Sequence, residues 1–501
     1  MHTALSGEPR ASAPARPPGG ALSGAQWLAA LVGLVLASLL VLQLADIGVY
    51  RHDAMYYLPR PAFFDKLLTE GRWLNYLLFP VLRLIPGPAA AIAALLCWGL
   101  FVFISARRWV GSPAYALLLA CLALQVTPLM NQLQWPATSL PAFALLALAA
   151  LLAPRLPAGL FYPLFAVLLF GSFSHLYYLL PLLHLHWLAG KDLTANLKTL
   201  WLKLIPLWAM GFVVGYGSAL LAVYLAGGGL GIAIEEWRRP HYIESGADLL
   251  DNSQRALHYL AQHLQPLLGK LWLVPLATGA VILSLMGNRV ARFVPLALLA
   301  LCMGGVHYLL TVPLGIVISF RTAGPLWLAC LVVMFFTPLR NRYQAALLLA
   351  CALALGTALY LQNRQALKWY NTITSTLQQA LLDTLPKPAG DYTGVVLLSD
   401  DAAVAAAVER IERHHRLAPG QMESLSRAAR WVPAAKAAGF NKVWLCGSQD
   451  RRQRPVCARI LTGVEPRAPA CRPGLYDIVG ESRGFLLVAI NPPECLAMLA
   501  E

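Results

Sequence analysis

The dominant pattern in this chain is a series of apolar runs near twenty residues long, separated by short polar segments. A helix of about twenty apolar residues crosses the hydrocarbon core of a bilayer. The pattern predicts about eleven spans, near residues 25–45, 88–106, 112–129, 137–153, 158–171, 174–189, 204–226, 271–287, 293–311, 322–337 and 343–361. We therefore expect a polytopic α-helical membrane protein.

Composition supports the same fold class. Hydrophobic residues make up 58% of the chain and charged residues 13%, whereas about 25% of the residues in a soluble domain are charged. The formal net charge is +15. Within the apolar part of the chain, the Lys and Arg residues lie in short loops between spans, where membrane topology explains them without nucleic acid.

The Lys/Arg bias also predicts an orientation. Alternate loops are basic, through Arg107, Arg108, Arg155, Lys191, Lys198, Lys203, Arg289, Arg292, Arg340 and Arg342. The intervening loops lack charge or balance it. By the positive-inside rule the N-terminus is cytoplasmic, and an odd number of spans places residues 362–501 on the opposite side.

The two ends of the chain differ from the apolar middle. Residues 1–24 are rich in Pro, Ala, Gly and Ser and predict a disordered tail. Residues 362–501 have no long apolar run and predict a small α/β domain. Its expected elements are strands at 394–400, 441–447 and 484–490 and a helix at 402–415.

Four of the nine cysteines lie in this tail, namely Cys446, Cys457, Cys471 and Cys495. An even number on the oxidising side of a membrane is compatible with two disulfides, and the local pairing is 446–457 with 471–495. A zinc site is the weaker alternative, because no C-x-x-C is present. A metal elsewhere is possible, but no ligand spacing supports one, and no cofactor is implied.

The loop after the first span, residues 46–87, carries an unusual density of polar and aromatic residues. Its Asp46–Tyr76 stretch includes Asp46, Asp53, Asp65 and Glu70 together with four basic residues. Segments 61–70 and 73–85 are too short to span and predict interfacial helices. Asp65 and Glu70 are expected on the polar side of the first of these, as surface residues.

The predicted spans contain no Asp or Glu in their interiors. Coupled transporters keep such costly residues where function requires them, so their absence argues against ion-coupled transport but not against a passive flippase. Charged side chains instead gather in loops 46–87 and 227–270 on the non-cytoplasmic face, with Arg321 at the mouth of a span.

A carboxylate, basic groups and aromatic rings at the non-cytoplasmic surface of the membrane fit one chemistry. Sugar transfer from a polyprenyl phosphate needs a base for the acceptor hydroxyl and cations for the departing phosphate. Asp53 is the best-placed base and Asp46 the runner-up. The alternative for each is a solvated carboxylate at the membrane interface with no catalytic role. Further candidates for substrate binding are Tyr56, Arg72, Trp73, Gln134, Trp135, His175, Glu235 and Arg321, although aromatic-belt, capping or snorkelling roles would also explain several of them.

The order of these features resembles a known family. The first-loop acid, the phrase EGRWLNYLL (70–78) and the late Arg321–Thr322 pair are similar to bacterial glucosyltransferases that modify O-antigen with a polyprenyl-phosphate sugar. These enzymes belong to the integral-membrane GT-C superfamily, and the resemblance covers residues 25–360. It implies an inverting hexosyltransferase of the bacterial inner membrane, with Asp53 as base and Arg72 and Arg321 at the phosphate. Many relatives have adjacent acids where this chain has one, so the choice between Asp53 and Asp46 stays open.

The expected partners are the lipid bilayer, a polyprenyl-phosphate sugar and a lipopolysaccharide or other envelope glycan as acceptor. The main alternative is a non-enzymatic flippase of lipid-linked sugars or an envelope assembly protein, with the tail binding a partner. A polymerase or ligase that uses diphosphate-linked glycans is a further alternative, which differs only in the donor.

Overall fold

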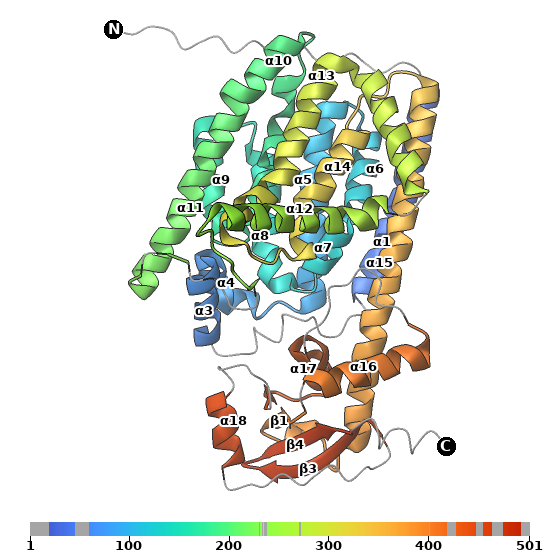
Figure 1. The fold of residues 1–501 in the computed structure, drawn as a ribbon. Helices are drawn as coiled ribbons and strands as arrows, with labels where there is room; N and C mark the ends of the chain where they lie inside the picture. Colours follow the sequence, from blue (N-terminus) through green and yellow to red (C-terminus); the bar gives the residue numbers. More distant parts are fainter. Residues whose placement is uncertain are drawn as a thin grey trace.

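The computed structural model describes residues 20–45, 60–229, 231–232, 234, 238–269, 272–399, 401–417, 427–446, 454–462 and 474–491. Within these residues, a large bundle of helices is followed by a small α/β domain at one end of the bundle (Figure 1). The bundle comprises α1 (Gly20–Ala45), α3 (Arg60–Glu70), α4 (Trp73–Leu82), α5 (Gly87–Val110), α6 (Pro113–Leu124), α7 (Thr127–Gln132), α8 (Pro136–Leu152), α9 (Ala158–Phe170), η1 (Ser174–Leu188), α10 (Leu193–Thr199), η2 (Leu200–Leu204), α11 (Ile205–Gly227), α12 (Gly246–Leu268), α13 (Leu273–Thr311), η4 (Val312–Leu314), η5 (Phe320–Ala323), α14 (Gly324–Phe335) and most of α15 (Arg342–Thr384).

Five helices of the described chain are long and apolar enough to cross a membrane: Gly24–Ala45, Gly87–Val110, Leu193–Gly227, Leu273–Leu314 and Arg342–Thr384. Large apolar side chains point outward from them, as with Leu202 (76% exposed) and Leu225 (74% exposed). Such surfaces are rare on soluble proteins and suit contact with lipid. The chain is thus a multi-pass helical membrane protein, as its sequence predicts.

Helices lie over all eleven predicted spans, but several are short. Five apolar helices of the described part have only 10–17 residues, among them α6, α8 and α9. The predicted spans 271–287 and 293–311 form one element, α13, which bends at Arg289 with φ 56°. The full number of crossings therefore stays a prediction.

The loop after the first span folds as expected where it is described. Two short helices, α3 and α4, stand where segments 61–70 and 73–85 predict them. They lie at the end of the bundle that faces the α/β domain (Figure 1).

The α/β domain is joined to the bundle by a continuous helix. α15 runs past the expected boundary at residue 361 without a break. Its second half supplies buried side chains to the core of the domain, including Trp369, Ile373 and Leu377. The Trp369 indole Nε1 donates to Glu412 Oε1 at 2.8 Å, so α15 holds the domain against the bundle.

The domain contains one four-stranded sheet of order β2-β1-β4-β3. β1 (Gly394–Leu397) is parallel to β2 (Val443–Leu445) and to β4 (Phe485–Ile490), while β3 (Tyr476–Ser482) is antiparallel to β4. These strands and α16 (Asp401–His415) confirm the three predicted strands and the predicted helix. The pattern did not predict β3, α17 (Arg427–Ala437) or α18 (Arg454–Leu461), because a bulge near Gly480 interrupts the alternation in β3 and the two helices are short.

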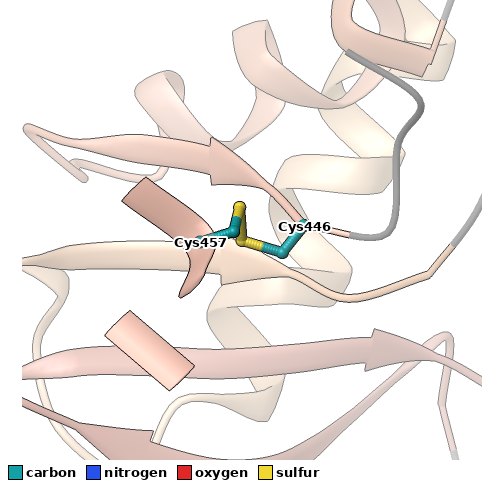
Figure 2. The surroundings of a disulfide bond; sticks show 2 residues. All are labelled: Cys446 and Cys457. Atoms are coloured by element: carbon teal, nitrogen blue, oxygen red, sulfur yellow. A yellow bond between two sulfur atoms is a disulfide. The ribbon is translucent and has the colours of Figure 1, made fainter. Parts of the chain in front are cut away.

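One predicted disulfide is present. Cys446 at the end of β2 is bonded to Cys457 in α18 (Figure 2). The bond ties α18 to the sheet on the side where Val396, Val479 and Leu487 form a small core. Cys471 and Cys495, the second predicted pair, lie outside the described residues.

Breaking this disulfide should loosen the domain. In Cys446→Ser the α/β domain is expected to lose about 3 kcal/mol of stability, because a closed loop of this size no longer restrains the unfolded chain. Protease digestion of the intact protein in detergent measures this as faster cleavage within residues 385–491. Cys302→Ser, which removes a free thiol in α13, is the control, and equal protease resistance in both variants would contradict the expectation.

Candidate functional site

The candidate site begins at the turn between α3 and α4. Gly71 adopts φ +69° and its N–H donates to Leu67 O at 2.9 Å, which ends α3 with a left-handed cap. A Cβ at Gly71 would also lie only 3.0 Å from Ala219 Cβ of α11. The turn brings the side chains of Glu70 and Arg72 together in an ion pair.

A buried polar network holds α4 against the turn that precedes η1. Leu74 N donates to Gly171 O at 2.9 Å, and Ser172 Oγ donates to Asn75 Oδ1 at 2.7 Å. Asn75 Nδ2 in turn donates to Thr138 O of α8 at 2.8 Å. All these groups lie inside the protein, so the network fixes the start of α4 relative to the start of η1.

That arrangement places Arg72 beside an aromatic cluster. The Arg72 guanidinium lies over the Phe173 ring, 4.1 Å from its centroid. Phe173 meets His175 edge to face, with centroids 5.5 Å apart. His175, which is buried, lies 6.4 Å from the ring of His307 in α13.

Arg321 approaches the same cluster from another direction. Its guanidinium lies over the Trp135 ring at 4.3 Å, and the adjacent Thr322 hydroxyl contacts His307 Nε2 at 3.0 Å. Since Thr322 Oγ1 donates its one proton to Ser319 O, His307 Nε2 must be the donor in that contact. η5, which carries Arg321, is thereby tied to α13.

A third arginine, Arg238, comes from the segment before α12. Arg238 O accepts from Val317 N at 2.8 Å, and His241 N donates to Leu314 O at 2.9 Å. These bonds hold the segment against the loop that leads to Arg321. Arg72, Arg238 and Arg321 all lie within electrostatic range of the His175 ring.

Glu70 is the acid of this cluster among the described residues, and here the sequence interpretation is wrong. It expects Glu70 on the exposed side of a surface helix, yet only 10% of its side chain is exposed. Burial by itself would raise the pKa of Glu70, but the charges of Arg72, Lys66 and Arg238 outweigh burial and hold the pKa well below its usual range. Glu70 stays ionised and orients Arg72, while Lys66 contacts it at 2.9 Å.

Glu70→Gln should therefore destabilise the protein in a pH-dependent way. We expect a loss of about 3 kcal/mol at pH 7, because two cations are left largely buried without their acid. The pKa of Glu70 is lower in the folded state than its ordinary value of 4.5. Its contribution is thus fully present above that value and is lost as the pH falls through and below it toward the folded pKa.

Denaturant unfolding in detergent at pH 7 and pH 3.5 measures this difference. Glu481→Gln is the matched control, since the Glu481–Lys387 pair is about half exposed and should contribute little. A Glu70→Gln effect as small as that of the control, or one that grows on acidification, would contradict the expectation.

The structure brings together four of the predicted site residues: Arg72, Trp135, His175 and Arg321. Gln134 neighbours Trp135 and donates from Nε2 to Asn131 Oδ1 at 3.2 Å. Trp73 packs its indole against Gly171, where no Cβ would fit. The remaining candidates, Asp46, Asp53, Tyr56 and Glu235, lie outside the described residues.

Three residues that build the cluster are not among the site residues predicted from the sequence: Asn75, Arg238 and His307. Asn75 and His307 are single polar residues within apolar segments. A polar residue in such a place indicates a structural or functional role, and this signal could have found both. Arg238 is one of two adjacent arginines, and only the backbone bonds of the loop distinguish it from the exposed Arg239.

Chemically, this end of the bundle gathers guanidinium groups against aromatic rings. Guanidinium groups match phosphate oxygens in pairs, and aromatic faces stack on sugar rings. Within the described residues no group of three or more His, Cys, Asp or Glu side chains is placed to hold a metal ion. No protein-family model, curated protein or solved structure matches this chain.

Proposed function

We propose that this protein is a membrane glycosyltransferase that transfers a hexose, such as glucose, from a polyprenyl-phosphate carrier to a cell-envelope glycan or lipid-linked acceptor with inversion. The observation that carries the proposal is that Arg72 and Arg321 meet one cluster. Arg72 lies over Phe173, which contacts His175, and Thr322, the neighbour of Arg321, contacts His307, whose ring is 6.4 Å from His175. Arg72 and Arg321 are 249 positions apart in the sequence (321 − 72), yet they belong to the same cluster. Both are predicted phosphate contacts.

The proposed chemistry divides between two groups of residues. Asp53 takes the proton of the acceptor hydroxyl while the acceptor oxygen attacks the anomeric carbon. The bond between that carbon and the phosphate oxygen breaks, and the phosphate leaves with the electron pair. Arg72, Arg238 and Arg321 neutralise the charge that develops on it, and Glu70 keeps Arg72 oriented.

The proposed function implies a membrane topology. The chain would be GT-C-like, with about eleven spans in the bacterial inner membrane, a cytoplasmic N-terminus and a periplasmic α/β domain. The candidate site lies at the end of the bundle that faces this domain (Figure 1). A phosphate bound there would sit at the periplasmic membrane surface, where a polyprenyl-linked sugar presents its anomeric carbon.

A transfer assay tests the proposal. Purified protein in liposomes, given a polyprenyl-phosphate hexose labelled in the sugar and an envelope glycan acceptor, should form a new glycosidic bond. Movement of the labelled lipid across the bilayer without bond formation would favour a flippase instead. Turnover of only a diphosphate-linked donor would favour a polymerase or ligase.

A further inference from the structure

α12 differs from the other long helices of the bundle. Its 23 residues would suffice to cross a membrane, but it is not among the helices apolar enough to do so. It begins at a capping box formed by Ser245 and Asp248. Instead of running with its neighbours, it lies across them (Figure 1).

The surface of α12 is divided into three stripes, each with helical spacing. The inner stripe, which packs on the bundle, contains Asn252, Ala256, His263 and Leu267. A second stripe is apolar and exposed, with Leu250 (61%), Leu257 (63%) and Leu268 (36%), joined by Ala261. The third stripe is polar and exposed and consists of Asp251, Gln254, His258, Gln262 and Gln265.

An exposed apolar stripe beside an exposed polar stripe is the signature of a helix in the plane of the membrane surface. Exposed aromatic residues flank α12 on both sides, Tyr242 before it and Trp272 after it, and such residues prefer the headgroup level. α12 also packs against α13, where the inner-stripe residue His263 contacts the Tyr308 hydroxyl at 2.7 Å and the next residues, Leu309 and Leu310, are exposed.

We infer that α12 is an in-plane interfacial helix, with its Leu250–Leu257–Leu268 stripe in contact with lipid acyl chains and its polar stripe in water. The bonds that α12 makes to the neighbouring segments then set the depth of the candidate site. Asn252 Nδ2 donates to His241 O at 2.7 Å, and Arg255 Nη1 donates to Gly315 O at 3.2 Å. These bonds hold the segments that carry Arg238 and Arg321 at the level of the lipid headgroups.

Site-specific fluorescence tests this inference independently of any transfer activity. Leu257→Cys and Gln262→Cys are labelled with the same environment-sensitive dye in protein reconstituted in phosphatidylcholine liposomes. Doxyl-labelled phosphatidylcholine should quench the dye at position 257 more strongly, and aqueous iodide should quench the dye at position 262. Unsubstituted protein, carried through the labelling, provides the background from native cysteines.

A second pair, Leu250→Cys and Gln265→Cys, repeats the comparison and guards against a local disturbance in one variant. Iodide quenching at both stripes would show α12 free in water and overturn the inference. Doxyl quenching at both stripes, or shielding of the leucine stripe from both quenchers by a second protein copy, would also overturn it.

Discussion

Asp53→Asn is expected to lower the rate of sugar transfer by roughly 10²–10⁴-fold, the usual contribution of a positioned general base. The amide has nearly the shape of the carboxylate but does not take the proton of the acceptor hydroxyl. The protein should still insert into the membrane, and binding of the donor should be retained, because the phosphate contacts remain. A single-turnover assay with labelled polyprenyl-phosphate hexose measures the effect.

Asp46→Asn serves as the comparison, because Asp46 adjoins the first span and is the other candidate base. Normal transfer by Asp53→Asn together with loss of transfer in Asp46→Asn would move the base to Asp46. Full activity in both variants would exclude the first-loop acid as the base.

Arg321→Ala is expected to lower transfer by roughly 10²–10³-fold, because a preorganised donor aimed at developing charge contributes at this level. The transfer rate of Arg321→Lys should fall between those of the unsubstituted protein and Arg321→Ala. Lysine keeps the charge but loses the two-pronged donor geometry and the planar contact with Trp135. Both substitutions should also weaken donor binding, which equilibrium binding of the polyprenyl-phosphate hexose measures.

Arg239→Ala controls for the loss of one positive charge near the site. Arg239 adjoins Arg238 but is exposed, and its loss should leave transfer nearly unchanged. Equal losses in Arg239→Ala and Arg321→Ala would show that only the overall charge of this end matters. Donor binding unaffected by Arg321→Ala would remove Arg321 from the phosphate site.

Local patterns predicted most of the elements because each has its own periodicity. Long apolar runs locate the spanning helices, and the short amphipathic segments correspond to α3 and α4. The Arg483–Gly484 turn, with φ of 52° and 78°, closes the β3–β4 hairpin in the way expected of a two-residue turn. The length of α15 was not predicted, because its polar second half is buried only by the α/β domain.

The case of Glu70 shows where a one-dimensional pattern fails. Helical spacing correctly places it on the polar side of α3. It contains no information that α11 packs against the end of α3, where Gly71 nearly touches Ala219, or that Arg238 comes within electrostatic range. An acid that looks solvated in sequence is therefore a buried partner of three cations.

By itself the sequence determined the membrane class, the helices over the long apolar runs and the α/β character of the tail, and it selected four side chains that the structure brings together. The tertiary structure alone decided that these four belong together, with Arg238 and His307 beside them. The physical reason is that the contacts join segments up to about 250 residues apart, through a left-handed glycine turn, a buried asparagine network and two paired loops. Such contacts depend on how helices pack, and no local period of hydrophobic and polar residues encodes them.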